Sequence, residues 1–299
     1  MPRSLRPFQI SQLRVIDITS GVDTMVYQSD SMLFEAPNWT PDGTALVFNG
    51  DGRLFQFDVE LQHLAEVDLE NLDPINNDHV ISPDGRYAFV SSDDGHIYRI
   101  DLEGSESRFR VSNDHGPNFR YYLHGISPDG KTLAYTGMTI SGGELQTNVY
   151  LIPANGGPDT QITNDVYPDD GPEFSHDGEW LYFNSERGSD VPGAAQLFVM
   201  RPDGSELQQL TFDERVNWFP HPDPTGRRLS YVSFPPGTLG HPADTEVIVR
   251  LRENDGTVRD LATVFGGQGT MNVASWNPDG TQLAYVAYPI VNDTSEVLS

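Results

Sequence analysis

A turn of the form Pro-Asp-Gly, or a close variant of it, recurs along the whole chain and is followed each time by an alternating apolar segment. Proline presets φ in such a turn, aspartate caps it through its side chain, and glycine takes the position with positive φ. Neighbouring closing glycines lie 42, 45, 48, 48 and 54 residues apart, a period that is typical of propellers and solenoids. The closing glycines are Gly43, Gly85, Gly130, Gly178, Gly226 and Gly280.

The segments after the turns have the pattern of β-strands. They read TALVFNG, RYAFVSS, KTLAYTG, EWLYFNS, RRLSYVS and TQLAYVA, with apolar residues at every second position. In most units two further strand-like segments follow, such as HIYRIDLEG and SRFRVSN. Four strands per unit without helical periodicity favour the blades of a β-propeller over a solenoid.

The pattern predicts one all-β domain, a six-bladed β-propeller with four antiparallel strands per blade, over residues 1–299. After the last turn the chain has too few strands for a whole blade, whereas two unassigned strands precede the first unit. We expect the two N-terminal strands to complete the last blade, which leaves no free sheet edge. The expected blades are about 34–68, 78–112, 122–163, 171–211, 217–264, and 272–290 together with 11–28.

The amino-acid composition excludes several kinds of partner and site. The 44 acidic residues outnumber the 18 basic ones and give a formal charge of −26, so the surface repels a phosphate backbone and nucleic acid is not an expected partner. The chain has no cysteine, which excludes disulfides and thiolate metal sites. The start carries no apolar signal segment, and no stretch is apolar enough for a membrane span, so we expect a cytoplasmic protein without a membrane partner.

Polar residues gather at one end of the predicted inner strands. Each turn closes its inner strand at one end of the propeller axis. The residues four to nine positions before the closing glycine therefore lie at the opposite end. The hairpins on this face are long in the third, fourth and fifth blades, which is typical of functional loops. The gathered residues are Glu35, Asn38, Asn77, Asp78, His79, His124, Asp169, Asp170, Glu173, Asn217, Trp218, His221, Gln268 and Asn272.

Three histidines of this face, His79, His124 and His221, occupy similar positions in different blades. They either hydrogen-bond backbone groups and join neighbouring inner strands, or they bind a metal together with carboxylate and amide oxygens. The residues alone leave both interpretations open. The segment GGQGT lacks the spacing of a phosphate-binding loop and predicts a tight turn that presents Gln268. The chain has no G-x-S-x-G elbow, so a serine peptidase is not expected.

The repeats ISPDGKTLAY, ISPDGRYAF and NPDGTQLAY resemble the TolB-type β-propeller repeat, and the resemblance covers nearly the whole chain. The same repeat builds the oligogalacturonate lyase propeller, in which axial histidines and a glutamine hold a divalent metal. This more distant likeness implies a manganese, calcium or zinc ion here. The likeness implies His79, His124, His221 and Gln268 as ligands, and Glu173 is a further expected ligand.

We expect, as the sharper hypothesis, a metal-dependent enzyme that acts on a sugar or uronate by lyase-type β-elimination, with Asp78 and His124 as catalytic residues. The expected substrate contacts are Asn77, Arg187, Asn217, Trp218 and Asn272. The rival hypothesis is a non-catalytic module whose axial face binds a peptide, a glycan or a partner protein. A third hypothesis is a structural scaffold, in which the polar residues only provide hydrogen-bond partners for one another inside the central channel.

Overall fold

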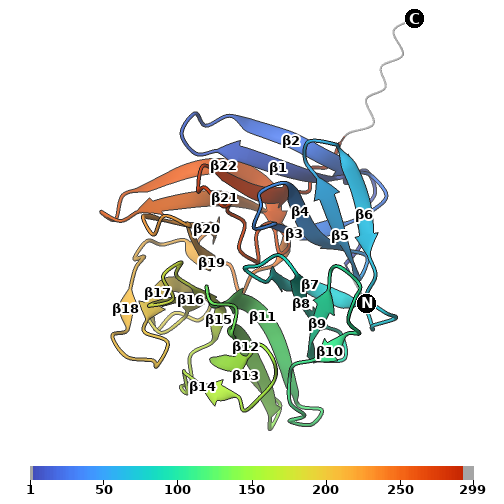
Figure 1. The fold of residues 1–299 in the computed structure, drawn as a ribbon. Coiled ribbons are helices and arrows are strands. Elements are labelled where there is room, and N and C mark those ends of the chain that lie inside the picture. The colour runs from blue at the N-terminus through green and yellow to red at the C-terminus, as the bar shows by residue number, and fades with distance from the viewer. Residues whose placement is uncertain (1–2, 292–299) are drawn as a thin grey trace, which may run out of the picture.

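The computed structural model describes residues 3–291, in which 23 strands form six sheets arranged radially around a common axis (Figure 1). Five sheets have four strands, and each of these runs through the chain in order from the inside of the propeller to its rim. All paired strands are antiparallel. The predicted six-bladed, all-β propeller is therefore confirmed.

The first three blades follow one another directly along the chain. The first consists of β3 (Phe34–Trp39), β4 (Ala45–Gly50), β5 (Arg53–Asp58) and β6 (His63–Val67). The second consists of β7 (Ile75–Ile81), β8 (Tyr87–Ser92), β9 (Ile97–Asp101) and β10 (Phe109–Arg110). The third consists of β11 (Phe119–Ile126), β12 (Thr132–Ser141), β13 (Glu144–Pro153) and β14 (Thr160–Gln161).

Two more blades and a closing sheet complete the circle. The fourth blade consists of β15 (Asp169–Phe174), β16 (Leu181–Ser185), β17 (Gln196–Met200) and β18 (Gln208–Gln209). The fifth consists of β19 (Val216–Pro222), β20 (Arg228–Phe234), β21 (Ala243–Glu253) and β22 (Val258–Gly267). The closing sheet joins β23 (Gln282–Ala287) to β1 (Ser11–Asp17) and β2 (Asp23–Ser29).

The closing blade differs from the others at its inner position. The N-terminal β1 pairs with β23 as predicted, but the segment inside β23 is irregular and forms an isolated bridge between Trp276 and Leu283. Backbone carbonyls of this segment face the axis instead: the carbonyls of Met271 and Asn272 lie 3.2 Å from ring nitrogens of His221 and His124. Contacts with other blades thus replace part of the regular strand pairing.

The recurring turn has the predicted chemistry, as the second blade shows. The Asp84 carboxylate accepts hydrogen bonds from the Ser82 hydroxyl (2.5 Å) and the Arg86 amide (3.1 Å), and Gly85 has a φ of 74°. These hydrogen bonds keep the pKa of Asp84 below its usual range. The turn is therefore structural, and it sets the start of the second strand of each blade.

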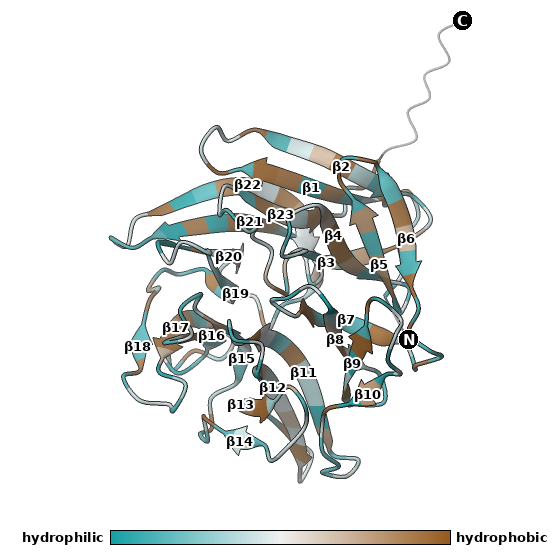
Figure 2. Cartoon of the chain, viewed as in Figure 1, coloured by the Kyte–Doolittle hydropathy of each residue, from teal (hydrophilic) through white to brown (hydrophobic). Residues whose placement is uncertain are grey.

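The core lies between adjacent blades. Phe34 and Phe48 of the first blade pack with Leu13 and Val286 of the closing sheet, and all four are buried. Figure 2 shows apolar stretches, in brown, on strands of the different blades. Because burying each such side chain contributes about 1.5–3 kcal/mol, packing between blades stabilises the closed ring.

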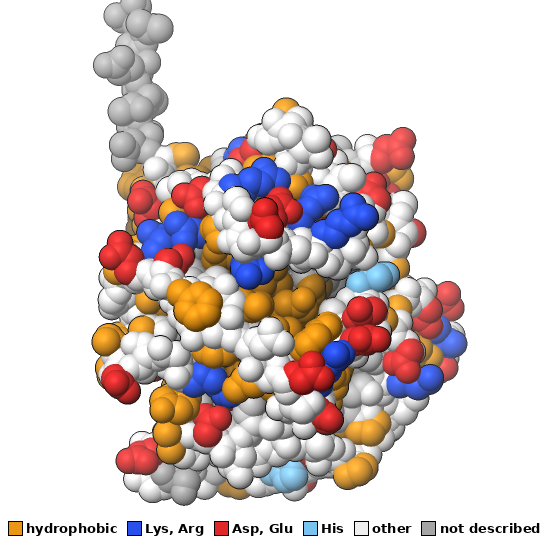
Figure 3. Space-filling view, turned by 90° about the vertical axis from the view of Figure 1, so that its left-hand side faces the viewer, with side chains coloured by type: hydrophobic (Ala, Val, Ile, Leu, Met, Phe, Trp, Pro, Cys, Tyr) orange, Lys and Arg blue, Asp and Glu red, His pale blue; other side chains and the backbone are white. Residues whose placement is uncertain are grey.

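Charged side chains of both signs are interspersed on the side of the molecule shown in Figure 3, with apolar side chains in its hollows. Arginines pair with several acidic residues of the protein; Arg250, for example, contacts Asp213 and Asp260 at 2.8 Å each. Within residues 3–291 no helix has the length and apolar character needed to cross a membrane.

Candidate functional site

The innermost strand of each regular blade contains a β-bulge a few residues before the recurring turn. A bulge leaves one or more residues unpaired and re-aims their side chains. Asp78 and His124 belong to these unpaired residues, which is why they leave the plane of their sheets at the axis. The pairing register shifts between Glu35 and Asn38, Ile75 and His79, Leu123 and Gly125, Asp170 and Glu173, and Trp218 and His221.

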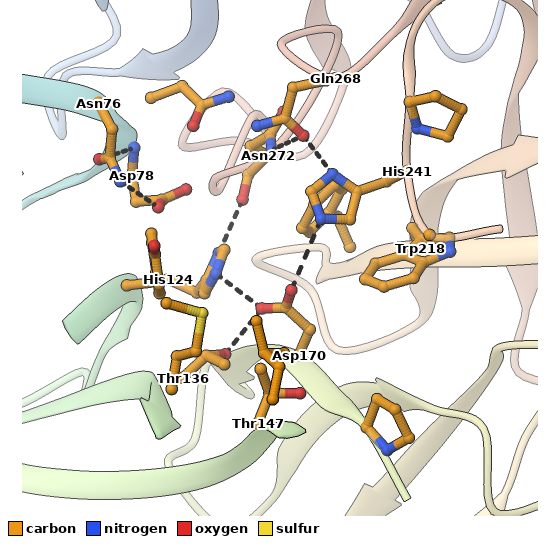
Figure 4. A pocket seen from close by; sticks show the side chains of 18 of the residues that line it. Asn76, Asp78, His124, Thr136, Thr147, Asp170, Trp218, His241, Gln268 and Asn272 are labelled. Carbon is orange, nitrogen blue, oxygen red and sulfur yellow. Dashed lines mark hydrogen bonds and ion pairs between the residues drawn. The ribbon is translucent and has the colours of Figure 1, made fainter. Parts of the chain in front are cut away.

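The bulged strands and the long hairpins surround a pocket of about 650 Å³, here called the axial pocket (Figure 4). This volume is in the range of about 300–1,000 Å³ that small-molecule sites have. Its polar lining includes Asn76, Asn77, Asp78, His124, Thr136, Asp170, Glu186, His241, Gln268 and Asn272. Its apolar lining includes Tyr122, Met138, Leu145, Trp218, Phe219 and Leu239.

His124 and Asp170 form a buried ion pair in the wall of the pocket. His124 Nε2 lies 3.1 Å from Asp170 Oδ1, which also accepts a hydrogen bond of 2.7 Å from the Thr136 hydroxyl. Burial lowers the pKa of His124, but the charge of Asp78 and the bond to Asp170 outweigh it and raise the pKa to about 9. Burial likewise raises the pKa of Asp170, yet His124 brings it down to about 2. His124 is therefore a fixed cation, because Asp170 and the Asn272 carbonyl occupy both of its ring nitrogens.

Asp78 is the pocket carboxyl that titrates near neutrality. Burial raises its pKa to about 7, although the neighbouring His124 charge lowers it. One carboxylate oxygen accepts a hydrogen bond of 2.8 Å from the Asn76 amide group. In the view of Figure 4 the carboxyl group points into the pocket. Asp78 is thus able to give and take a proton at neutral pH.

His241 lies on the opposite side of the pocket in Figure 4, in the hairpin between β20 and β21. Its Nδ1 contacts the Gln268 side-chain oxygen, which also accepts a bond of 3.3 Å from Asn272 Nδ2. Because an oxygen faces Nδ1, that nitrogen carries the proton and Nε2 is left as a free base. Burial lowers the pKa of His241, only partly offset by Asp170, whose Oδ2 lies 3.8 Å from Nε2.

The glycines around Gln268 confirm the predicted tight turn. Gly267 and Gly269 have φ values of 97° and 88°, which favour glycine. A Cβ at Gly267 would collide with the Pro242 carbonyl, next to His241. The turn therefore brings Gln268 against the His241 hairpin, and Trp218 holds the other side of the imidazole at 4.5 Å between ring centroids.

His79 and His221 serve to join blades. His221 Nδ1 lies 2.6 Å from Glu173 Oε2, and its Nε2 lies 3.2 Å from the Met271 carbonyl, so both ring nitrogens are occupied by neighbouring blades. His79 is fully buried with Nε2 3.4 Å from the Val47 carbonyl of the first blade. Burial lowers its pKa to about 4, so it is neutral. For His79 and His221 the geometry therefore supports hydrogen bonding between neighbouring blades over metal binding.

The expected metal ligands do not form one set. Within the described residues 3–291, no group of three or more His, Cys, Asp or Glu side chains is placed to hold a metal ion. His79 contacts the first blade, His221 is paired with Glu173, and His124 is paired with Asp170. Of the expected ligands, His124 and Gln268 line the axial pocket. The residues present therefore do not fit a resident divalent ion.

The expected substrate contacts divide into two groups. Asn77, Trp218 and Asn272 line the axial pocket. Arg187 does not, because its guanidinium is bound to Asp169 at 2.6 Å and to Asp165 at 3.0 Å.

Asn217 also lies outside the lining of the pocket. It is fully buried, and its amide nitrogen donates to the side chains of Gln196 and Asp213 at 3.1 Å each. Its side-chain oxygen accepts a bond of 2.7 Å from the Ser233 hydroxyl. Asn217 therefore positions the fourth and fifth blades.

Sequence reasoning missed His241, Asn76 and Thr136. His241 lies in a hairpin whose length did indicate function, so its histidine was a usable signal. Thr136 lies on the second strand of its blade, and its role arises only from its bond to Asp170 of the next blade. The sequence pattern of a single repeat cannot predict such a contact between blades.

Comparison with known proteins identifies the family of this chain. Residues 107–285 match the family model described as TolB beta propeller domain. The chain belongs to the TolB β-propeller family. A relative from Agrobacterium fabrum (strain C58), named "Uncharacterized protein Atu1656", is 37% identical over 284 residues, which span 93% of this chain and 92% of the relative.

Solved structures agree with this TolB-type assignment. The structure of "putative TolB from Agrobacterium tumefaciens" has a TM-score of 0.85 and 35% identity, covering 95% of this chain and 99% of that one. An oligogalacturonate lyase in complex with manganese has a TM-score of 0.60 and 16% identity, covering 99% of this chain and 88% of that one. The lyase therefore shares the fold, and its manganese is a property of that protein.

Proposed function

We propose that this TolB-type propeller is an enzyme that binds a sugar in the axial pocket and moves a proton on it by general acid–base catalysis. The observation that carries the proposal is the placement of Asp78 and His241 on opposite sides of one pocket. Their surroundings displace their pKa values in opposite directions, upward for Asp78 and downward for His241. Such a pair is typical of acid and base roles in one site.

The chemistry follows from the proton each group holds near neutrality. Neutral His241 takes a proton from the substrate at Nε2, and protonated Asp78 delivers one on the opposite side. In an elimination the C–H bond breaks toward His241, its electron pair forms the new double bond, and the departing oxygen takes the proton of Asp78. An isomerisation uses the same two groups without loss of the oxygen.

The polar and aromatic lining supports a ligand rich in hydroxyl groups. Amide and hydroxyl side chains line the pocket beside the aromatic rings, namely those of Asn76, Asn77, Thr136, Thr147, Gln268 and Asn272. Trp218, Phe219 and Tyr122 offer ring faces to the apolar face of a sugar.

The charges of the pocket favour a neutral sugar over a uronate. Its described lining contains the carboxyl groups of Asp78, Asp170 and Glu186 but no lysine or arginine. The His124 cation is already paired with Asp170. A substrate carboxylate would therefore meet mainly negative charge. A peptide or protein partner on the same face is the rival that the following experiment separates.

The test is solvent deuterium incorporation. Neutral aldoses, ketoses and uronates are incubated with the protein in deuterated buffer, and binding is measured in parallel by titration calorimetry. We expect a neutral sugar to bind and to acquire deuterium, Asp78→Asn and His241→Gln to abolish the exchange, and both variants to retain binding. Binding without exchange in the wild type would indicate a non-catalytic module. Failure of all three sugar classes to bind would contradict the proposal.

Addition of manganese, calcium or zinc is a separate arm of this experiment. Since the described residues do not provide a ligand set, exchange should be unchanged by the ions or by a chelator. A chelator-sensitive reaction on a uronate would instead support the lyase-type chemistry implied by the more distant likeness.

A further inference from the structure

We infer that Arg3 is a positioning residue for the proposed reaction, because its guanidinium holds together the two chain segments that carry His241 and Gln268. Arg3 Nη1 donates to the main-chain carbonyl of Gln268 at 2.7 Å, and Nη2 lies 3.0 Å from Asp244 Oδ1. Asp244 follows His241 by three residues. The catalytic part of this inference rests on the proposed function, whereas the effect of Arg3 on the His241 ring can be measured without a substrate.

Further contacts hold the Arg3 guanidinium in place. Nη1 also lies 3.2 Å from Glu35 Oε1, and the guanidinium carbon lies 4.2 Å from the centre of the Tyr288 ring. A planar guanidinium has several donors in a fixed arrangement and can bind these partners at the same time, which the single ammonium of a lysine cannot do in the same geometry. Arg3 therefore joins the first blade, the turn of Gln268 and the His241 hairpin at one point.

Asp244 is bound by two more side chains from residues 3–9. Arg6 Nη2 lies 2.9 Å from Asp244 Oδ2, and Gln9 Nε2 donates to Asp244 Oδ1 at 2.6 Å. Asp244 has a φ of 58°, which is uncommon for a residue other than glycine. The three side chains thus stabilise an unusual backbone conformation directly after the His241 hairpin, and this conformation sets the direction in which the hairpin leaves its strand.

The turn of Gln268 and the His241 hairpin meet at the point that Arg3 holds. The Gln268 amide donates to the Pro242 carbonyl at 3.2 Å, and the Gln268 side-chain oxygen contacts His241 Nδ1. Since Arg3 binds one partner on each side of this junction, its loss should let the turn and the hairpin move apart. The contact between Gln268 and His241 should weaken as a result.

This contact decides which ring nitrogen of His241 carries the proton. The Gln268 oxygen faces Nδ1, and Asp170 Oδ2 lies 3.8 Å from Nε2, so two acceptors compete for the one proton of the neutral ring. The charged groups near the ring are Asp170 and the His124 cation. When the Gln268 contact weakens, Asp170 draws the proton to Nε2, which then cannot accept a proton from the substrate. Arg3 thus acts on the reaction through the tautomer of His241.

The experiment determines the tautomer by nitrogen NMR of the full chain with labelled histidine at pH 8, without a substrate. His241 is neutral at this pH because burial lowers its pKa, and His241→Gln identifies its signals. The wild type should carry the proton on Nδ1, and Arg3→Met should shift the tautomer ratio toward Nε2 about tenfold. Arg14→Met is the matched control, because Arg14 is 23% exposed and pairs with Asp23 at 3.0 Å in the closing sheet; it should leave the His241 signals unchanged.

Kinetics on a sugar that reacts give the second measurement. Arg3→Met should lower kcat about tenfold with little change in KM, because Arg3 does not line the axial pocket. Arg3→Lys keeps the charge but not all of the contacts, so its kcat should lie between those of Arg3→Met and the wild type.

The outcomes separate this inference from the proposed function. An unchanged tautomer in Arg3→Met would overturn the inference, whether or not a sugar reacts. A shifted tautomer together with no reaction of any sugar in the wild type would support the effect of Arg3 on His241 and contradict the proposed function. Arg3→Met leaves the buried Glu35 without its cation. Should that variant not fold, Arg3→Met/Glu35→Gln removes both charges and gives the same decision.

Discussion

His124 of β11 and Asp170 of β15 form an ion pair between two blades at the propeller axis, with Nε2 3.1 Å from Oδ1. Neither strand pairs with the other in a sheet, so this contact joins the third blade to the fourth through side chains alone. The pair also sets the charge of the axial pocket, because it lies between Asp78 and His241 in Figure 4. Its removal should therefore affect both stability and chemistry.

Replacing one partner of this pair should be more harmful than replacing both. Asp170→Asn leaves the buried His124 without its counter-charge, and we expect a loss of about 3 kcal/mol in the free energy of unfolding. The double variant His124→Gln/Asp170→Asn should lose less than the two single variants added together. Urea denaturation of the four proteins measures the coupling. Strict additivity would show that the pair contributes no interaction energy.

Asp78 should make stability fall as the pH rises. Its folded pKa of about 7 is above the ordinary aspartate value of 3.8, so between these pH values the folded state holds a proton that the unfolded state releases. The stability from this group is complete below pH 3.8 and is lost as the pH rises to about 7, with an upper limit of about 4 kcal/mol. Asp78→Asn should thus be more stable than the wild type at pH 8 but not at pH 4. Urea midpoints at both pH values test it, and equal effects at both would contradict the raised pKa.

The proposed reaction should have a narrow pH window. Neutral His241 is required as base, so activity falls on the acid side, at a lower pH than for an ordinary histidine because burial lowers its pKa. Protonated Asp78 is required as acid, so activity falls again above about pH 7. Profiles of kcat/KM should be bell-shaped, and each of Asp78→Asn and His241→Gln should reduce kcat by about 10²- to 10⁴-fold. A profile that keeps rising above pH 8 would reject Asp78 as the acid.

His221 and His79 should respond differently to the same substitution. His221→Leu leaves Glu173 buried without its partner and should cost about 3 kcal/mol. His79→Leu also removes a buried Nδ1 that has no partner among the described residues, so its cost should be within about 1 kcal/mol. Thermal and urea unfolding of the two variants give the comparison. If both variants lose equal stability, the assigned contacts do not explain the roles of these histidines.

The sequence predicted the fold closely because its signal is local and repeated. Each turn uses its own side chains, as at Ser82 and Asp84, and each strand alternates on its own. The closure by β1 and β23 could be predicted by counting strands, since a free edge is unfavourable. The irregular segment before Trp276 could not, because its carbonyls face side chains of other blades.

The candidate site was predicted less completely. Asp78, His124 and Gln268 line one pocket. For Asp78 and His124 the distance from the turn glycine indicated the end of the axis, whereas Gln268 lies on the tight turn before the last inner segment. Their partners were not predictable. Arg187 on a long hairpin looked available but is bound by Asp165 and Asp169, and His241 acquires its role only through Gln268.

The amino-acid sequence by itself determined six sheets and the face on which polar residues gather, because turn chemistry and alternation act within a few residues. Only the tertiary structure decided which of these residues share a pocket and which proton each one holds. Bulges in the inner strands re-aim the side chains, and burial beside groups from other blades sets their charge. Such effects depend on how separate sheets meet, and no repeat contains that information.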